Sequence, residues 1–383
     1  LKVHHKYSML SAILLLASSL LPSAMGSLGC KDESGRPVDW FVAIKHNDGF
    51  AYSYLDAKSQ SSFKVSSHSL DKTSGGSIVS TLMQVYESEF MFVNHTDESI
   101  FFDNNTTADK YSLQRNNVSR YNLTSATSGD IAYAFYNDEH PDGKKSTYDA
   151  HSKGVIAFDT SSGFWLIHSM PKWPNSPSKG YEGLPDYRYG QSFLCITMST
   201  SQFDSIGQQQ QMTRPYMYDS YISDSLASKA PGIADWFDGK NTETDSNAIS
   251  ITSKGGVHFK HIAKSRDWGK DLYEDLVAPE LNADLLAETW QNGGGDIGAY
   301  CKADGKKYDV VDVKEMKLGD DDWTINQDHS KWAISTSGRS KWVCVGDINR
   351  QTSQTKRGGG TVCQSNSQVH GAFVDGVVDQ DSC

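Results

Sequence analysis

The stretch HSKWAISTSGRSKWVCVGDIN, residues 329–349, contains two short apolar runs on either side of a polar turn. The runs at 332–334 and 342–345 are rich in β-forming residues, and the turn between them contains Gly338. This pattern is typical of a β-hairpin, in which the chain returns to the end where its first strand began. We therefore expect the His-x-Lys tripeptide before the first run to lie beside the Gly-Asp-Ile-Asn sequence after the second.

The same arrangement occurs once more, 178 residues earlier in the chain. The tripeptide His151-Ser152-Lys153 precedes a second pair of apolar runs, which a short turn connects and which ends at His168. In the register that we expect, Val155 faces His168, so the hairpin brings His168 back beside the tripeptide. A single His-Ser-Lys is usually part of a solvated loop. Its repetition before two similar hairpins predicts an internal repeat.

The first residues have the features of a secretory signal peptide. Basic residues precede the apolar segment 9–21, and Ala24-Met25-Gly26 provides a small-x-small cleavage site. We assign residues 1–26 to this peptide, which predicts a protein of the secretory pathway that is either secreted or lysosomal. No other apolar run approaches membrane-spanning length, so we expect no membrane partner.

The cysteines and the glycosylation sequons agree with that compartment. Six cysteines follow the signal peptide, and an even number in a secreted chain indicates disulfides. Because no CxxC or HExxH pattern occurs and no Cys/His cluster has zinc spacing, we expect neither a metal nor another cofactor. The sequons cluster in one region, which we expect to be exposed and far from an active cleft, at Asn94, Asn104, Asn105, Asn117 and Asn122.

The charge distribution points to acid conditions for any polyanionic partner. The formal net charge is −11, which disfavours binding to a polyanion at neutral pH. Twelve histidines can gain charge in acid. Residues 329–357 are locally basic, with six cations against Asp347. From this region we take Asp347, Asn349, Arg350 and Arg357 as candidate substrate-binding residues.

Strands and helices are expected to alternate in two layered lobes, residues 27–205 and 206–383, with a mixed α/β (α+β) fold. A helix is predicted around 78–86, and a second, mostly helical segment is predicted over 271–290 with a break at Pro279. Residues 200–215 are polar and are predicted to form the linker. Further strands are predicted at 40–44, 52–56, 90–93, 131–136, 193–197, 250–252, 257–262 and 310–313.

Two histidines and two lysines at one site suit phosphodiester cleavage without a metal ion. One neutral imidazole can attack phosphorus, while a second, protonated imidazole donates a proton to the leaving oxygen. Lysine ammonium groups neutralise the transition state. Because the two imidazoles titrate as a coupled pair, we expect a bell-shaped pH profile with an acid optimum. The candidate catalytic residues are His151, Lys153, His168, His329 and Lys331.

Several segments resemble the deoxyribonuclease II family over nearly the whole mature chain. They are 35–42 (GRPVDWFV), 151–155 (HSKGV), 163–169 (GFWLIHS), 189–191 (YGQ), 271–273 (DLY), 328–332 (DHSKW), 344–350 (CVGDINR) and 357–363 (RGGGTVC). The resemblance implies a phospholipase D-like pseudodimer of two similar lobes, each with a central sheet flanked by helices, and an active site at the lobe interface. It implies metal-independent hydrolysis of double-stranded DNA to 3′-phosphate products through a phosphohistidine.

The resemblance also implies roles for particular residues. The five candidate catalytic residues match family positions, and Asn349 lies where the wider superfamily has an Asn that contacts phosphate. By superfamily habit His151 is the nucleophile and His329 the acid. The superfamily Asp five residues after each Lys is missing, because those positions are Phe158 and Thr336. The disulfides that the resemblance implies are Cys30–Cys195, Cys301–Cys383 and Cys344–Cys363.

Two other functions fit the same sequence. A secreted DNA-binding or host-interaction protein with the same fold but little or no turnover would also carry the sequons and the acidic surface. A phospholipase D-type lipase would share the chemistry, although no apolar segment suggests membrane docking. Double-stranded DNA is the expected partner, and the oligomeric state, monomeric pseudodimer or homodimer, stays open.

Overall fold

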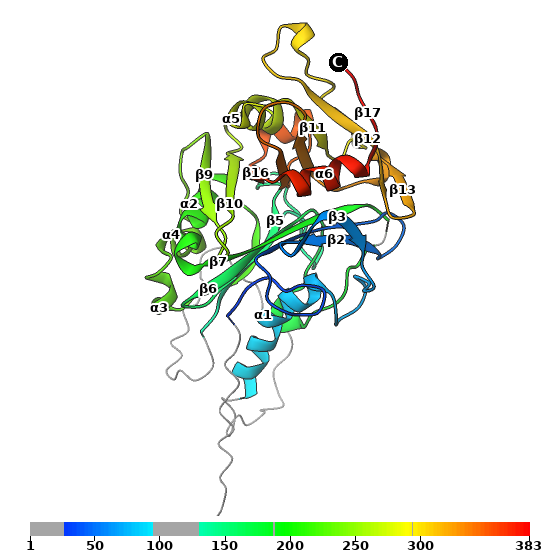
Figure 1. Cartoon of the computed structure of the whole chain (residues 1–383). Coiled ribbons are helices and arrows are strands. Elements are labelled where there is room, and N and C mark those ends of the chain that lie inside the picture. Colours follow the sequence, from blue (N-terminus) through cyan, green and yellow to red (C-terminus); the bar gives the residue numbers. More distant parts are fainter. Residues whose placement is uncertain (1–26, 95–129, 187, 293) are drawn as a thin grey trace, which may run out of the picture.

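A computed structural model describes residues 27–94, 130–186, 188–292 and 294–383, which form two large β-sheets with few helices (Figure 1). The mixed α+β class is therefore confirmed. The predicted signal peptide and four of the five sequons, Asn104, Asn105, Asn117 and Asn122, lie outside the described residues. The fifth sequon residue, Asn94, is the last residue of helix α1.

The first sheet has eight strands among the described residues, in the order β3-β2-β1-β7-β6-β5-β4-β8. In chain order they are β1 (Trp40–Lys45), β2 (Tyr52–Asp56), β3 (Ser59–Val65), β4 (Ala132–Asn137), β5 (Lys153–Phe158), β6 (Ser162–His168), β7 (Gln191–Ser199) and β8 (Met217–Tyr221). The α-helices of the chain are α1 (Ser77–Asn94), α2 (Phe203–Thr213), α3 (Asp224–Ala227), α4 (Pro231–Phe237), α5 (Ala278–Leu281) and α6 (Ser367–Gly376).

The second sheet has nine strands in the described residues, in the order β13-β12-β11-β14-β15-β16-β10-β9, with β17 paired to β12. They are β9 (Ser246–Thr252), β10 (His258–Lys264), β11 (Leu285–Glu288), β12 (Val310–Leu318), β13 (Asp321–Thr324), β14 (Trp332–Ser335), β15 (Trp342–Gly346), β16 (Gly359–Ser365) and β17 (Val377–Gln380).

Both predicted hairpins are present, as β5–β6 and β14–β15. The register expected for the first is wrong by two residues, because Val155 faces Leu166 rather than His168. Gly154 pairs with Ile167, so His168 lies level with Lys153. The shorter turn draws His168 even closer to the tripeptide than the sequence suggested.

The two sheets share a central strand order. Five neighbouring strands of the first sheet, in the spatial order β1-β7-β6-β5-β4, correspond to five of the second, in the order β10-β16-β15-β14-β11. Every pair of neighbours in these two series is antiparallel. The order is consistent with two similar lobes. The pseudodimer stays a prediction. The lobe boundary between residues 205 and 206 also stays a prediction, and strand β8, which follows this boundary in the chain, pairs with β4 of the first sheet.

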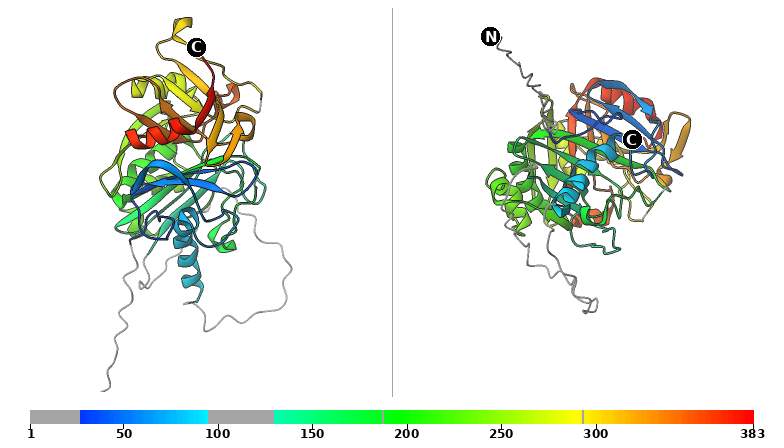
Figure 2. Two further views of the ribbon diagram at one scale, coloured as in Figure 1. Left: turned by 45° about the vertical axis from the view of Figure 1, so that its right-hand side comes forward. Right: turned by 90° about the horizontal axis from the view of Figure 1, so that it is seen from below.

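Figures 1 and 2 show the two sheets as adjacent layers of the molecule. The described residues form three apolar clusters, and the largest combines side chains of both sheets, such as Trp165 of β6 and Val345 of β15, with residues of α2, α4 and α6. The second packs α1 on the outer face of the first sheet, and the third packs residues 272–283 on the outer face of the second sheet. The apolar contacts between the sheets bring the ends of the two hairpins together.

Three predicted elements are wrong. Residues 90–93 belong to helix α1, not to a strand. Residues 200–215 are mostly helix α2 rather than a linker, because three of its four glutamine side chains are buried and hydrogen-bonded, as Gln211 is to the carbonyl of Gly232. The expected helix over 271–290 is a short π-turn, Tyr273–Val277, followed by α5 and then strand β11.

The misread segment has a clear physical cause. Leu285 and Leu286 continue the helical spacing of the preceding leucines, but β11 is buried throughout and pairs with β12 on one side and β14 on the other. A strand buried on both faces is apolar at consecutive positions and cannot be distinguished from a buried helix by periodicity. Pro279 lies in the first turn of α5 and does not break it.

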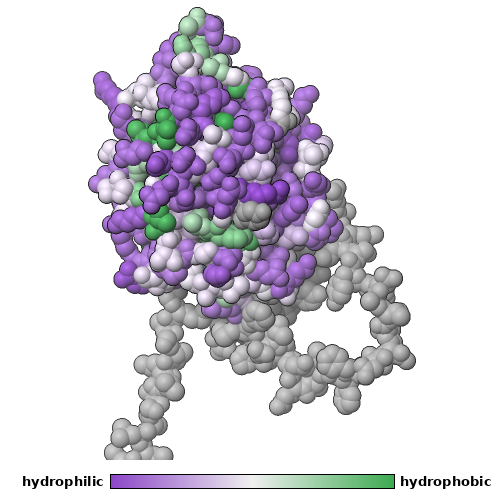
Figure 3. All heavy atoms as spheres, turned by 90° about the vertical axis from the view of Figure 1, so that its right-hand side faces the viewer, coloured by the Kyte–Doolittle hydropathy of each residue, from purple (hydrophilic) through white to green (hydrophobic). Residues whose placement is uncertain are grey.

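The three disulfides pair as the family resemblance implied: Cys30–Cys195, Cys301–Cys383 and Cys344–Cys363. The last of them joins β15, the second strand of the second hairpin, to the neighbouring strand β16. No helix within the described ranges is both long and apolar enough to cross a membrane. The face shown in Figure 3 is mostly hydrophilic, with small separate apolar patches.

Candidate active site

The two His-x-Lys tripeptides meet where the sheets face each other. Burial and next the charge of Lys153 depress the pKa of Lys331 well below its ordinary value. Burial, Lys331, Lys153 and then His151 likewise lower the pKa of His329. Lys153 and Lys331 are fully buried, His151 is nearly so, and His329 remains partly exposed. Asp347, whose carbonyl contacts Nδ1 of His151, directly follows the residue whose N–H donates to the carbonyl of Lys331, so the two tripeptides are adjacent.

Each catalytic-type histidine is held by a group from the other half of the chain. The Nδ1 of His151 lies 2.6 Å from the backbone carbonyl oxygen of Asp347. The Nδ1 of His329 lies 3.2 Å from Oε1 of Gln191. Since both partners are acceptors, each Nδ1 carries the proton and each Nε2 keeps a lone pair. These contacts replace the missing superfamily Asp as the groups that orient the imidazoles.

The backbone crosses between the halves in the same reciprocal way. The N–H of His151 donates to the carbonyl of Gly358, and the N–H of His329 donates to the carbonyl of Gly190, both at 2.9 Å. A Cβ on Gly190 would lie 2.5 Å from Oδ1 of Asp328, and one on Gly358 would lie 2.1 Å from the carbonyl of Thr213. Only glycine permits this approach. Neither histidine is therefore fixed without the opposite lobe.

Two buried lysines hold the residues that precede these glycines. Lys45, the last residue of β1, donates to the carbonyl of Tyr189 at 2.8 Å. Lys264, the last residue of β10, donates to the carbonyl of Arg357 at 2.6 Å. Strands β1 and β10 occupy corresponding places in their sheets. The two lysines therefore have equivalent roles, because each fixes the backbone next to a glycine that binds one of the two histidines.

Replacing Lys264 with methionine should lower the turnover number by about 100-fold, since a small displacement of His151 misaligns the reacting atoms. Lys264→Met removes the hydrogen bonds to the carbonyls of Gln354, Thr355 and Arg357. The matched control is Lys260→Met on the same strand, whose ammonium bonds Glu280 at the surface. Steady-state cleavage of a DNA substrate checks this, and full activity in Lys264→Met would contradict it.

Asp138 is an acidic member of the site that the sequence analysis missed. Its carboxylate lies 2.5 Å from Nζ of Lys153, 3.2 Å from Arg357 and 3.8 Å from Nε2 of His151. Burial opposes ionisation, but Lys153, His151 and Arg357 together hold the pKa of Asp138 well below its usual range. The feature of the sequence that could have identified Asp138 is its position directly after strand β4, whose last residue, Asn137, pairs with Lys153.

The lysines of the two tripeptides share one local geometry. Nζ of Lys153 donates to the carbonyl of His151 at 3.3 Å, and Nζ of Lys331 donates to the carbonyl of His329 at 2.5 Å. In each case the ammonium folds back to the backbone of the histidine of its own tripeptide. Two ammonium groups held in this way present positive charge to any anion between the histidines.

His168 lies beside Lys153 but is sealed from solvent. It packs against Trp173 and Phe193 and is fully buried. Burial and then Lys153 lower the pKa of His168 to about 3, so the ring is neutral under ordinary conditions. Its predicted catalytic role stays a prediction, and this neutral state suits a positioning group better than a proton donor.

The four candidate substrate-binding residues have different surroundings. The carbonyl of Asp347 holds His151, and its carboxylate accepts from the N–H of Gly360. Arg357 turns toward Asp138 and the carbonyl of Asp149. Asn349 is buried, and its side-chain oxygen has no hydrogen-bond partner among the described residues. Their contacts with substrate stay predictions.

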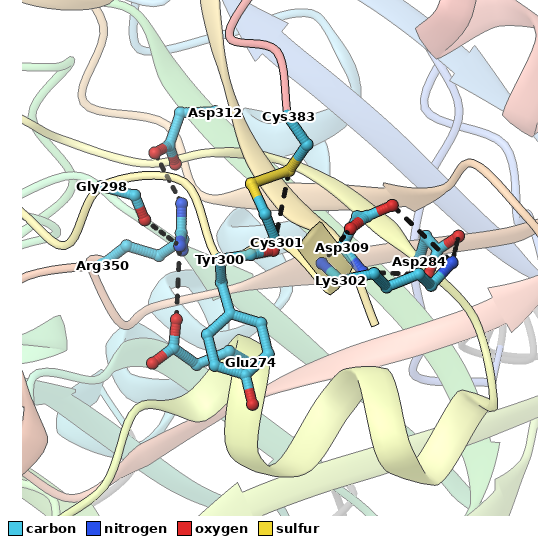
Figure 4. Close-up of a disulfide and its surroundings, with 10 residues drawn as sticks. All are labelled: Glu274, Asp284, Gly298, Tyr300, Cys301, Lys302, Asp309, Asp312, Arg350 and Cys383. Carbon is cyan, nitrogen blue, oxygen red and sulfur yellow. Dashed lines mark hydrogen bonds and ion pairs between the residues drawn. A yellow bond between two sulfur atoms is a disulfide. The ribbon is translucent and has the colours of Figure 1, made fainter. Parts of the chain in front are cut away.

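Arg350 lies in a separate ion-pair network (Figure 4). Its guanidinium is 2.5 Å from Asp312 and 3.5 Å from Glu274, and it donates to the carbonyl of Gly298. The side chain is fully buried between these partners. The structure thus gives Arg350 a role in joining β12 to the segment after β15, and its predicted contact with substrate has no support in this arrangement.

The chain is similar to known proteins over nearly its whole length. A sequence profile described as Deoxyribonuclease II matches residues 29–114 and 90–383. The chain belongs to the deoxyribonuclease II family. It is 35% identical to Plancitoxin-1 of Acanthaster planci, with 97% of this chain and 96% of that protein covered. It is 32% identical to Deoxyribonuclease-2 of Caenorhabditis elegans, with 97% and 98% covered.

A mammalian relative is similar over the same length. Deoxyribonuclease-2-alpha of Rattus norvegicus is 33% identical, with 94% of this chain and 95% of that protein covered. Membership of the deoxyribonuclease II family makes the chain a nuclease of the hydrolase class and supports DNA as its substrate. Over the described residues, no group of three or more His, Cys, Asp or Glu side chains could hold a metal ion.

Proposed function

We propose that the protein is an acid endodeoxyribonuclease that cuts double-stranded DNA without a metal ion, through a phosphohistidine, and leaves 3′-phosphate ends. The observation that carries this proposal is that the two His-x-Lys tripeptides adjoin one another, each with a buried lysine and with its imidazole held through Nδ1, which leaves Nε2 for reaction. The three disulfides and the predicted signal peptide support action in the secretory pathway, in lysosomes or outside the cell.

The proposed first step forms a bond between Nε2 of His151 and phosphorus while the bond from phosphorus to the 5′-oxygen breaks. His329, protonated, donates its proton to that oxygen. Lys153 and Lys331 neutralise the non-bridging oxygens. Water then attacks phosphorus, His329 accepts its proton, and the phosphorus–nitrogen bond breaks to release a 3′-phosphate.

The environments of the two histidines support this division of roles. His151 is nearly buried and donates from Nδ1 to a fixed backbone carbonyl. Burial, and next the charge of Lys153, lower the pKa of His151. A neutral imidazole is the form that attacks. His329 is partly exposed, so it can exchange protons with solvent. Because burial also lowers the pKa of His329, acid conditions and a bound phosphate favour its protonation.

Asp347 should make the stability of the folded protein fall as pH rises toward neutrality. Burial raises the pKa of Asp347 to about 7, whereas an unfolded Asp titrates near about 4. Between these values the folded state holds the proton more tightly, so its stabilising effect is complete below about pH 4 and is lost through about pH 7. The carboxyl of Asp347 therefore makes the folded protein more stable in an acid compartment than at neutral pH.

The variant Asp347→Asn isolates that effect, because an amide keeps the acceptor for Gly360 and does not titrate. The unfolding free energy of the wild type minus that of the variant should fall with rising pH by up to about 1.4 kcal/mol per pH unit. Urea unfolding of both proteins at about pH 4, 5.5 and 7 measures the difference. A difference that does not change with pH would show that Asp347 does not titrate in this range.

Relaxation of supercoiled plasmid at acid pH in the presence of a chelator tests the proposed function. We expect nicking that persists with the chelator, products with 3′-phosphate ends, and a labelled phosphohistidine at position 151 after an alkaline denaturing quench, which preserves the phosphorus–nitrogen bond, and peptide mass analysis. DNA binding without nicking would favour the turnover-free alternative. Loss of activity with the chelator would overturn the metal-independent mechanism.

A further inference from the structure

A pocket of about 420 Å³ opens beside His329, on one side of the paired tripeptides. Its wall includes two partly exposed aromatic side chains, Tyr189 and Trp290, together with Gln191 and His329 itself. The size falls within the range of small-molecule sites, about 300–1,000 Å³. Whatever occupies this pocket lies next to the group that donates a proton to the leaving oxygen in the proposed mechanism.

The aromatic rings of the pocket form a continuous set with the histidine. The ring centroids of Trp290 and His329 are 5.1 Å apart at 70°, and those of Trp290 and Tyr189 are 4.8 Å apart at 75°. The guanidinium of Arg188 lies 5.4 Å from the centre of the Tyr189 ring. Aromatic rings and arginine planes of this kind are the surfaces on which nucleic-acid bases stack.

The charges around the pocket are arranged in pairs. Arg188 is 2.5 Å from Asp186, and Lys172 is 3.9 Å from Glu139. Each cation of the rim therefore has an acidic neighbour, so the rim carries little net positive charge. A phosphate group is expected to bind between Lys153 and Lys331, where positive charge is concentrated. The pocket itself is suited to a planar, uncharged group.

The pocket also marks the point where the two lobes differ. On β4, Asn137 pairs with Lys153, and the next residue is Asp138. On β11, Glu288 pairs with Trp332, so Thr289 lies level with Lys331 and the next residue is Trp290. Corresponding positions thus carry an acid beside His151 and an indole beside His329. A site with this asymmetry can bind the two sides of a phosphodiester differently.

We propose that this pocket holds the unpaired base of the nucleotide next to the scissile phosphate, stacked on the face of Trp290 with its edge toward Tyr189. This inference rests on the proposed nuclease function and adds a condition to it. A base inside a duplex is stacked on its neighbours and cannot reach a protein pocket without leaving the helix. Cleavage is therefore fastest beside a base that is already unpaired.

The test uses end-labelled duplexes that are identical except for one mismatched base pair. The wild type should cut the phosphodiester next to the mismatch roughly 10-fold faster than the same bond in the paired duplex, because a mismatched base leaves the helix at a lower cost in free energy before it stacks in the pocket. Trp290→Ala should cut both duplexes at similar rates. Trp268→Ala, which removes a partly exposed indole elsewhere on the second lobe, should keep the preference.

The ratio of the two rates separates the outcomes, since a general effect of Trp290 on His329 changes both duplexes alike. Equal cleavage of the two duplexes by the wild type overturns the inference, as does a preference that survives in Trp290→Ala. If Trp290→Ala does not fold, Trp290→Phe serves, with a preference smaller than that of the wild type expected. Failure of the wild type to cut either duplex would overturn the proposed function itself.

Discussion

Alanine in place of either His151 or His329 is expected to slow DNA cleavage at acid pH by on the order of 10⁴-fold. Each imidazole performs a step that the other cannot perform alone, because one forms the bond to phosphorus and the other moves the proton. The double variant should be little worse than the slower single variant, since residues that act as a unit are not additive. Single-turnover rates on one DNA substrate measure all three.

His258→Ala is the matched control for these variants. His258 is exposed on β10, where its ring contacts Thr252 and no residue of the site. This variant should cleave DNA at the rate of the wild type. A single variant at His151 or His329 that retains most of the activity, while remaining folded by thermal unfolding, would show that the tripeptides do not form the reacting centre.

The substitution Asp138→Asn is expected to lower the free energy of unfolding by about 3–5 kcal/mol. The carboxylate is buried between Lys153 and Arg357, and an amide of the same size leaves both cations without a counter-charge. Activity should fall as well, because the ammonium of Lys153 would lose the carboxylate that holds it in place. Because the pKa of Asp138 lies well below its ordinary value, this ion pair persists in mildly acid solution.

Asp142→Asn provides the comparison, because Asp142 pairs with Lys144 at 2.9 Å on the surface. Such exposed pairs stabilise a protein by about 1 kcal/mol or less. Denaturant unfolding at acid pH should therefore show a large loss for Asp138→Asn and a small one for Asp142→Asn. If both variants are as stable as the wild type, the carboxylate of Asp138 is not the support that its contacts indicate.

The crossed supports mean that neither lobe contains a complete site. His151 depends on the carbonyls of Asp347 and Gly358, and His329 depends on Gln191 and the carbonyl of Gly190. A shift of one sheet against the other would therefore displace both imidazoles at once. We infer that the apolar cluster between the sheets contributes to activity through the alignment of these two groups.

The hairpins and the two tripeptides could be predicted from the sequence because their signals are local. Apolar runs around a Gly-containing turn specify a hairpin, and a hairpin specifies which of its residues meet. The pairing of the six cysteines followed from the likeness to a family rather than from spacing. The expected register of the first hairpin was wrong by two residues, because the small polar residues 160–162 allow turns of different length.

The supports of the histidines could not be predicted in the same way. Asp347 and Gly358 act through backbone carbonyls, which carry no signature in the side-chain sequence. Gln191 and Asp138 reach the site only because β7 and β4 take particular places in the first sheet. The same dependence on tertiary position made β11 resemble a helix, since a strand covered on both faces loses its alternation.

The most direct test of the account is a crystal structure of the protein with orthovanadate, which mimics phosphorus in its transition state. We predict vanadium bound between Nε2 of His151 and His329, with Lys153 and Lys331 in contact with its oxygens. Vanadate that contacts residues of only one tripeptide, or that binds elsewhere, would contradict the claim that both halves of the chain build a single reacting centre.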